Sequence, residues 1–222
     1  MSEPAFVAST RRAYDTVAVD YERLLRDALD ASPLDRALLG VWAEQVAAAG
    51  GGPVVDLGCG PGRLTGHLRS LGLDVSGLDL SPGMVAVARR TCPGTAFVVG
   101  SLLALPYADG ALAGALAWYS VIHTPPDRLP EVVRELVRVV RPGGPLLLAF
   151  QAGSGQPHRG ERPYGHDVSL TSYRHDAERV GALLAEAGAP VSTRVLREPE
   201  GFETTRQAFL LAWRGPAIIR RG

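Results

Sequence analysis

One segment within the first third of the chain, residues 54–65, constrains the fold more than any other. It begins with a short apolar run, Val54–Leu57, continues through glycines at every second position, and passes into a helix-forming stretch. The glycines are Gly58, Gly60 and Gly62. Glycine permits tight dihedral angles and a close approach of the backbone to a ligand. A buried strand that enters a helix through such a turn predicts an α/β fold, with ligands outside the carboxyl ends of the strands.

The rest of the chain alternates between short apolar runs and longer amphipathic stretches. Residues 6–39 are predicted to be helical with a break at Ser32-Pro33, and a second helix is predicted over 34–49. Strands are predicted over residues 54–57, 74–80, 96–100, 112–120 and 144–152. Helices are predicted between them over residues 63–71, 82–91 and 126–141. This alternation predicts a doubly wound, mostly parallel sheet with helices on both faces.

The last third of the chain departs from this rhythm. Residues 153–167 are rich in Gly, His, Arg and Pro and are predicted to form a long loop, a feature that is often functional. A helix is predicted over residues 171–188, followed by strands over 191–196 and 208–214. The length suits a single domain, residues 1–222. We expect a helical cap over 1–50, a ligand-binding core over 51–152, and a substrate loop with C-terminal strands over 153–222.

The charges balance, with 23 basic and 23 acidic residues. A net charge of zero gives no long-range attraction to phosphate backbones or anionic lipids, so neither nucleic acid nor membrane is an expected partner. No apolar run approaches the ~20 residues that cross a bilayer, and the N-terminus lacks a signal-peptide pattern. The two cysteines are too few for a disulfide framework, so we expect a cytoplasmic protein. Every basic residue is arginine, which excludes lysine chemistry such as Schiff-base formation.

An acidic residue ends the second predicted strand. Asp79 lies 23 positions after Asp56, where a carboxylate is placed to accept hydrogen bonds from both hydroxyls of a ribose. Leu80 and Met84 could then enclose an adenine ring. The glycine spacing is GxGxG with a proline inside, whereas the fingerprint of nicotinamide dinucleotide sites is GxGxxG.

Four motifs occur in the order found in one enzyme family. They are Asp56–Gly62 (DLGCGPG), residues 77–84 (GLDLSPGM), residues 100–110 with Leu105-Pro106 and Asp109-Gly110, and residues 139–144 (VVRPGG). This series resembles the class I methyltransferases that use S-adenosylmethionine (SAM). Tyr14-Asp15 and Tyr21 resemble the capping helix of the same family, which implies a role for both tyrosines near the substrate.

The resemblance implies a seven-stranded sheet whose last strand is antiparallel, with SAM across the strand ends. The implied cofactor contacts are Asp56, Gly58, Cys59, Gly60, Asp79, Leu80, Met84, Ser101, Leu102 and Tyr119. One position departs from the pattern, because many relatives carry an acid after the third strand where this chain has Ser101. A hydroxyl accepts a hydrogen bond from adenine more weakly than a carboxylate does, so recognition would rest on the backbone of Leu102.

Methyl transfer needs alignment above all, and it needs a base when the acceptor atom carries a proton. His123 follows the fourth predicted strand and is the candidate catalytic base, with helix capping or packing as its alternative role. Arg159, Arg162, Tyr164 and His166 are candidate substrate contacts in the 153–167 loop; the arginines suit a carboxylate or phosphate, or they are simply solvated. The histidines lack the spacing of a metal site, so no metal is expected.

The sequence therefore predicts a SAM-dependent methyltransferase acting on a small molecule. The acceptor atom could be oxygen, nitrogen or carbon, and an oxygen with His123 as general base is preferred. The alternative is a catalytically silent SAM-binding protein that acts as a sensor or partner subunit. The sequence gives no indication of oligomeric state.

Overall fold

A seven-stranded sheet forms the centre of the computed structural model, which describes residues 3–160, 162–201 and 203–216. The strands are β1 (Val54–Leu57), β2 (Val75–Asp79), β3 (Phe97–Val99), β4 (Gly114–Trp118), β5 (Pro145–Gln151), β8 (Val191–Arg197) and β9 (Gln207–Trp213). Their order across the sheet is β3-β2-β1-β4-β5-β9-β8. The first five strands pair in parallel, and β9 pairs antiparallel with both β5 and β8. The predicted mostly parallel sheet with an antiparallel last strand is confirmed.

Helices cover both faces of this sheet. They are α1 (Ala5–Leu25), α2 (Pro33–Ala48), α3 (Arg63–Ser70), α4 (Pro82–Thr91), α5 (Leu129–Val139) and α6 (Ala177–Glu186), with short 3-10 turns η1 (Val121–His123) and η2 (Pro163–Gly165). Alternate side chains of β5 enter opposite cores, as the pleat requires. Leu146, Leu148 and Phe150 pack with α5 and α6. Leu147 and Ala149 pack with α2 and α3 on the other face.

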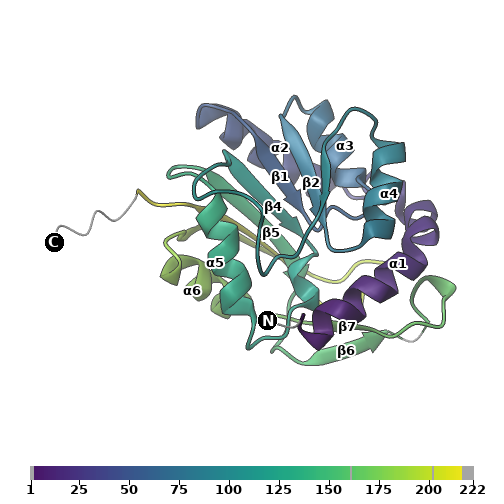
Figure 1. Cartoon of the computed structure of the whole chain (residues 1–222). Helices are drawn as coiled ribbons and strands as arrows, with labels where there is room; N and C mark the ends of the chain where they lie inside the picture. Colours follow the sequence, from purple (N-terminus) through teal and green to yellow (C-terminus); the bar gives the residue numbers. More distant parts are fainter. Residues whose placement is uncertain (1–2, 161, 202, 217–222) are drawn as a thin grey trace.

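Hydrogen bonds join helix α1 to the start of α4. Figure 1 shows it between α4 and a small hairpin made of β6 and β7, and it contacts both. The Asp15 carboxylate accepts hydrogen bonds from the Ser81 hydroxyl at 2.5 Å and from the Gly83 N–H at 2.9 Å. Ser81 in turn accepts from the N–H of Met84 and caps α4. The two helices are therefore linked by hydrogen bonds next to the end of β2.

The segment after β5 differs from the prediction. The expected loop over residues 153–167 contains β6 (Pro157–Gly160), which pairs antiparallel with β7 (Leu170–Tyr173). The helix predicted from residue 171 begins only at Ala177, because the Asp176 side chain accepts the Arg179 N–H at 3.0 Å and caps the helix there. Thr171 and Tyr173 are residue types that favour a strand. The predicted helix wrongly included them, because the apolar residues that follow them recur with a helical period.

Candidate functional site

A cleft of about 800 Å³, counting the open space at its mouth, lies between the strand ends and helix α1. Its wall comes from the turn after β1, the ends of β2, β3 and β4, one face of α1, and α5. The cleft lies where a doubly wound sheet is expected to bind its ligand.

The glycine turn after β1 uses its own backbone donors internally. The N–H groups of residues 58 and 59 donate to the Leu78 carbonyl, that of residue 60 donates to the Asp79 carboxylate, and that of residue 62 donates to the carbonyl of residue 59, at 2.7 to 3.1 Å. Pro61 has no N–H. A turn that binds a pyrophosphate presents such donors to the ligand. This turn therefore has no free N–H over residues 58–62 for that purpose.

Asp56 lies behind the turn and is 1% exposed. Its carboxylate accepts the hydroxyl of Thr65, a residue in the first turn of α3, at 2.7 Å. Burial raises its pKa to about 6. This carboxylate therefore lies beside the first turn of α3, the end of a helix that favours negative charge. Asp56 does not line the cleft, and its contacts hold the turn on the helix.

Asp79 lines the cleft at the end of β2. One carboxylate oxygen accepts the Gly60 N–H and the other accepts the Ser81 N–H, both at 2.8 Å. Each oxygen keeps a further lone pair, as the predicted role toward two ribose hydroxyls requires. Burial raises the pKa of Asp79 to about 6. Leu80 and Met84 line the same part of the cleft.

The remaining predicted cofactor contacts divide into two groups. Gly58, Gly60, Ser101, Leu102 and Tyr119 line the cleft. The Ser101 hydroxyl accepts the Leu103 N–H at 3.2 Å, so it shapes its own turn. Cys59 lies outside the wall, with its thiol buried against neighbouring side chains and its pKa raised by that burial. It is therefore a packing residue of the turn and not a reactive thiol.

Ser120 was not predicted to contribute. It lines the cleft directly after Tyr119, and its buried hydroxyl has no hydrogen-bond partner among the described residues. It also packs against the turn, since a Cβ on Gly58 would lie 2.2 Å from the Ser120 Cβ. An unpaired buried hydroxyl in a cleft wall is a position where a ligand can complete the hydrogen bonding.

Tyr14 and His123 meet across the cleft although they are 109 residues apart in sequence. The Tyr14 hydroxyl lies 2.7 Å from His123 Nε2, and His123 Nδ1 lies 2.8 Å from the Thr171 carbonyl oxygen. A carbonyl can only accept, so Nδ1 carries the proton and Nε2 accepts from Tyr14. Burial lowers the pKa of His123 to about 4 and raises that of Tyr14. Both groups are therefore uncharged at neutral pH.

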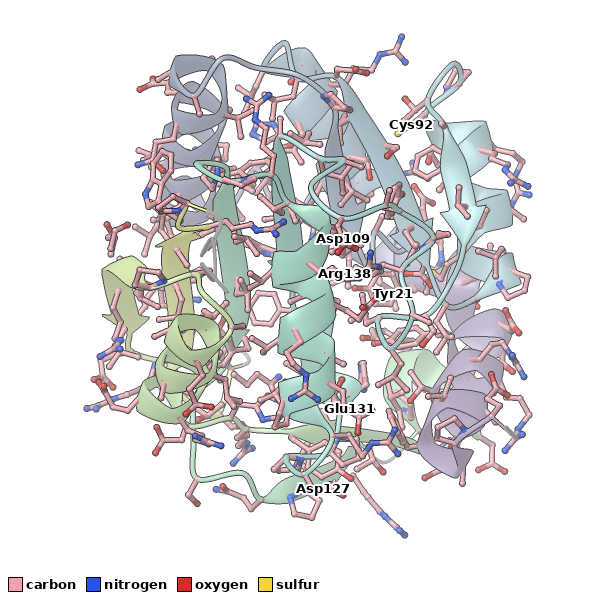
Figure 2. All side chains as sticks on the ribbon, turned by 60° about the vertical axis from the view of Figure 1, so that its left-hand side comes forward. Tyr21, Cys92, Asp109, Asp127, Glu131 and Arg138 are labelled. Atoms are coloured by element: carbon pink, nitrogen blue, oxygen red, sulfur yellow. The ribbon has the colours of Figure 1, made fainter. Side chains whose placement is uncertain are left out.

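Two further tyrosines extend this aromatic cluster. Tyr21, labelled near the centre of Figure 2, lines the cleft and makes an edge contact with Tyr14 at a ring distance of 5.9 Å. Tyr164 of η2 packs on Tyr21 with ring centres 4.8 Å apart. His166 Nε2 lies 2.8 Å from an Asp20 carboxylate oxygen. The 162–168 segment is therefore held on α1, with Tyr164 and His166 behind the wall of the cleft.

The two candidate arginines are not brought into the site. Arg159 lies on β6 and Arg162 precedes η2; both are exposed, and neither lines the cleft. The antiparallel pairing of β6 with β7 places this part of the chain beside α1, outside the wall. They do not belong to the wall of the cleft, and their binding of a carboxylate or phosphate stays a prediction.

Part of the wall was missed from the sequence. Helix α1 also contributes Phe6, Val7 and Thr10. Together with Tyr14 and Tyr21 they recur at helical spacings of three, four and seven, so they share one face. That periodicity was present in the sequence, and it could have extended the site along the helix.

The 105–109 segment is tied to α5 by a pair of charged side chains. Arg138, labelled in Figure 2 close to Asp109, donates to the carbonyls of Leu105 and Tyr107 and to the Asp109 carboxylate. Glu135 accepts the Leu105 N–H at 2.8 Å and pairs with Arg138. These contacts fix the segment that follows the cleft-lining residues 100–103.

Comparison with known proteins adds a family to this geometry. Residues 54–144 match the family described as a methyltransferase domain. The chain carries a methyltransferase domain. The match runs from the first residue of β1 to the residue before β5, so the methyltransferase domain includes the glycine turn, Asp79 and His123.

The relatives of this domain include methyltransferases that are named for different substrates. The chain is 35% identical over 136 residues to demethylmenaquinone methyltransferase from Beutenbergia cavernae, covering 61% of this chain and 55% of that protein. It is 36% identical over 104 residues to malonyl-[acyl-carrier protein] O-methyltransferase from Enterobacter lignolyticus, covering 47% and 41%. The chain thus spans about half the length of the curated relatives it matches.

The fold agrees with solved methyltransferase structures over nearly the whole chain. The crystal structure of magnesium protoporphyrin IX methyltransferase from Synechocystis PCC 6803, with bound SAM, superposes with a TM-score of 0.70 at 17% identity. The superposition covers 97% of this chain and 100% of that one. The Rossmann-like methyltransferase fold therefore extends beyond the segment matched in sequence.

The described residues contain no group of three or more His, Cys, Asp or Glu side chains placed to hold a metal ion. No helix among them is long and apolar enough to cross a membrane.

Proposed function

We propose that this chain is a SAM-dependent methyltransferase that acts on a small molecule, with an oxygen as the acceptor atom. SAM is the cofactor, and Asp79, Leu80, Met84, Ser101 and Leu102 would hold its adenosine part. Two observations support SAM as the ligand of this cleft. Each carboxylate oxygen of Asp79 keeps a lone pair that can accept from a ribose hydroxyl, and the glycine turn has no free N–H group that could bind a pyrophosphate. The unpaired Ser120 hydroxyl offers one more contact at the strand end.

The observation that carries the choice of an oxygen acceptor is the neutral hydrogen-bonded chain from the Thr171 carbonyl through His123 to Tyr14. When bound, SAM supplies an activated methyl group on a positively charged sulfur. As the acceptor oxygen forms its new bond, its proton passes to the Tyr14 oxygen and the Tyr14 proton passes to His123 Nε2. The Nδ1–H bond to Thr171 holds the imidazole in this orientation throughout.

The low pKa of His123 sets the pH range of this step. A pKa of about 4 leaves Nε2 free to accept a proton across the physiological range, although it lowers the driving force for taking one. With SAM at saturation, the single-turnover rate should therefore stay level from neutral pH down to about 5. It should fall only as the pH approaches 4 and the imidazole becomes protonated in the resting protein.

Single-turnover rates of His123→Ala test the proposal. We expect a decrease of roughly a hundredfold or more with little change in SAM affinity, the usual contribution of a positioned base. His175→Ala is the matched control: this buried imidazole also lies at hydrogen-bond distance from a backbone carbonyl, that of Val121, but it does not line the cleft. Both variants should lose stability. An unchanged rate per folded molecule in His123→Ala would remove His123 as the base.

A further inference from the structure

We propose that the methyl acceptor has an uncharged, mostly apolar body with a single reacting hydroxyl, held between the N-terminal half of α1 and helix α5. This inference deepens the proposed function and rests on it. It concerns the acceptor compartment, the part of the cleft wall formed by Phe6, Val7, Thr10, Leu103, Thr124 and Val132.

The acceptor compartment contains no side chain that carries a charge. Three of its residues lie on α1, one follows β3, one follows η1, and one is on α5, and their polar atoms are two threonine hydroxyls. The neighbouring Tyr14 and His123 form the neutral pair that links α1 to η1. Among the described residues that line the cleft, the single carboxylate is Asp79, at the far side beside the glycine turn.

A charged group on the body of the acceptor would meet no counter-charge in this compartment. Moving an ion out of water is costly unless it is paired and hydrogen-bonded in its new site. The nearest candidates from the sequence, Arg159 and Arg162, lie on the exposed hairpin side of α1 and do not line the cleft. Acceptors whose body carries a carboxylate, phosphate or ammonium group are therefore disfavoured.

The polar groups that are present suit one hydroxyl. Tyr14 donates its proton to His123 and keeps lone pairs that can accept from a ligand. The surrounding Val7, Thr124 and Val132 are buried, at 4%, 4% and 1% exposed. A mostly apolar pocket orients a ligand through a few placed polar groups, and the Tyr14 oxygen is the one that is linked to His123.

Matched triples of phenols test the inference, because each triple keeps the reacting hydroxyl and the size while the charge of the tail changes. One triple is 4-propylphenol, 3-(4-hydroxyphenyl)propanoate and tyramine; another is 6-ethyl-2-naphthol, 6-hydroxy-2-naphthoate and 6-(aminomethyl)-2-naphthol. Binding to the protein saturated with the demethylated product, S-adenosylhomocysteine, is measured by calorimetry. We expect the neutral member of at least one triple to bind ten times more tightly than both charged members.

A charge introduced into the acceptor compartment provides the second test. Thr10→Arg places a guanidinium in the wall, and Thr16→Arg makes the same change on an exposed position of the same helix. Thr10→Arg should improve binding of the propanoate relative to 4-propylphenol by about tenfold or more, the scale of a buried charge pair. Thr16→Arg should leave the ratio as in the unaltered protein. Equal ratios in the two variants would contradict the position assigned to the acceptor.

The outcomes separate this inference from the proposed function. If no neutral member of any triple binds more tightly than its charged counterparts, the inference is wrong. If the protein methylates the charged members faster than the neutral one, measured as the S-adenosylhomocysteine formed from SAM, the proposed methyl transfer is supported and the inference about the acceptor is wrong. If the neutral members bind selectively but SAM is never converted, the compartment prefers neutral ligands as inferred, but the proposed methyl transfer is wrong and the ligand is not a methyl acceptor.

Discussion

Replacing Gly58 by alanine tests whether the turn after β1 is packed as the structure shows. Gly58 has a φ of +75°, and an added Cβ would lie 2.2 Å from the Ser120 Cβ. A left-handed conformation costs a non-glycine residue about 1–2 kcal/mol. Overpacking in a well-filled site adds about 1–3 kcal/mol. Together these predict a loss of about 2–5 kcal/mol in the free energy of unfolding.

Gly60→Ala is the matched control. Gly60 also has a positive φ, +54°, but a Cβ there would meet only the edge of Tyr21 at 3.9 Å, an ordinary contact. It should therefore lose only the conformational part, about 1–2 kcal/mol. Ser120→Gly in the Gly58→Ala background removes the clashing Cβ. It should restore most of the overpacking part, less the cost of a further glycine, about 0.5–1 kcal/mol.

Urea denaturation followed by circular dichroism, without cofactor, measures all four proteins. The midpoints should shift while the slope stays constant, since the exposed area on unfolding is unchanged. Equal destabilisation of Gly58→Ala and Gly60→Ala would refute the reasoning, because the close contact with Ser120 would then carry no energy. A double variant no more stable than Gly58→Ala would refute it independently.

Four further predictions concern the cofactor and the packing of residues 105–109 on α5. Asp79→Ala should weaken SAM binding by about 1.5–3 kcal/mol, the scale of hydrogen bonds to a charged group, and calorimetry showing unchanged affinity would remove Asp79 from the site. SAM affinity of the unaltered protein should fall as the pH drops below about 6, where Asp79 takes up a proton and can no longer accept from both hydroxyls, and Asp79→Asn should abolish that pH dependence. In thermal scans SAM and S-adenosylhomocysteine should raise Tm whereas NAD and NADP should not; a larger shift with NAD would contradict the interpretation of the glycine turn. In urea denaturation, Arg138→Ala should lower the free energy of unfolding more than Arg179→Ala does. Arg138 donates hydrogen bonds to two carbonyls and two carboxylates, whereas the Arg179–Glu186 pair is exposed. Equal losses would show that Arg138 does not stabilise the packing of residues 105–109 on α5.

The alternating pattern of the first two thirds of the chain was sufficient to predict the sheet and its helices. Short apolar runs such as Val54–Leu57 are buried on both sides, and the glycine turn and Asp79 follow strands at fixed offsets. These are local signals, so the part of the cleft beside the glycine turn was predictable. The β6–β7 hairpin was not, because Leu170–Tyr173 is short and runs directly into a helical pattern.

The part of the cleft beside Tyr14 and His123 depends on contacts between segments that are far apart in the chain, and the sequence alone does not show such contacts. Tyr14 reaches His123 across 109 positions, and Asp15 reaches Ser81 across 66. The low pKa of His123 is a consequence of that burial, whereas the sequence suggested a base titrating near neutral pH. Likewise, the charge and position of Arg159 and Arg162 suggested a binding role, while the pairing of β6 with β7 places them outside the wall.

The central claim is that this cleft transfers a methyl group from SAM to a small molecule. Incubating the protein with SAM labelled with deuterium on the methyl group, in the presence of a metabolite extract, tests it most directly. We predict that mass spectrometry finds the labelled methyl group on a compound of the extract, and that Asp79→Ala reduces this transfer at limiting SAM. Binding of SAM with no label on any compound would contradict the account, and it would identify the chain as a SAM-binding protein without catalysis.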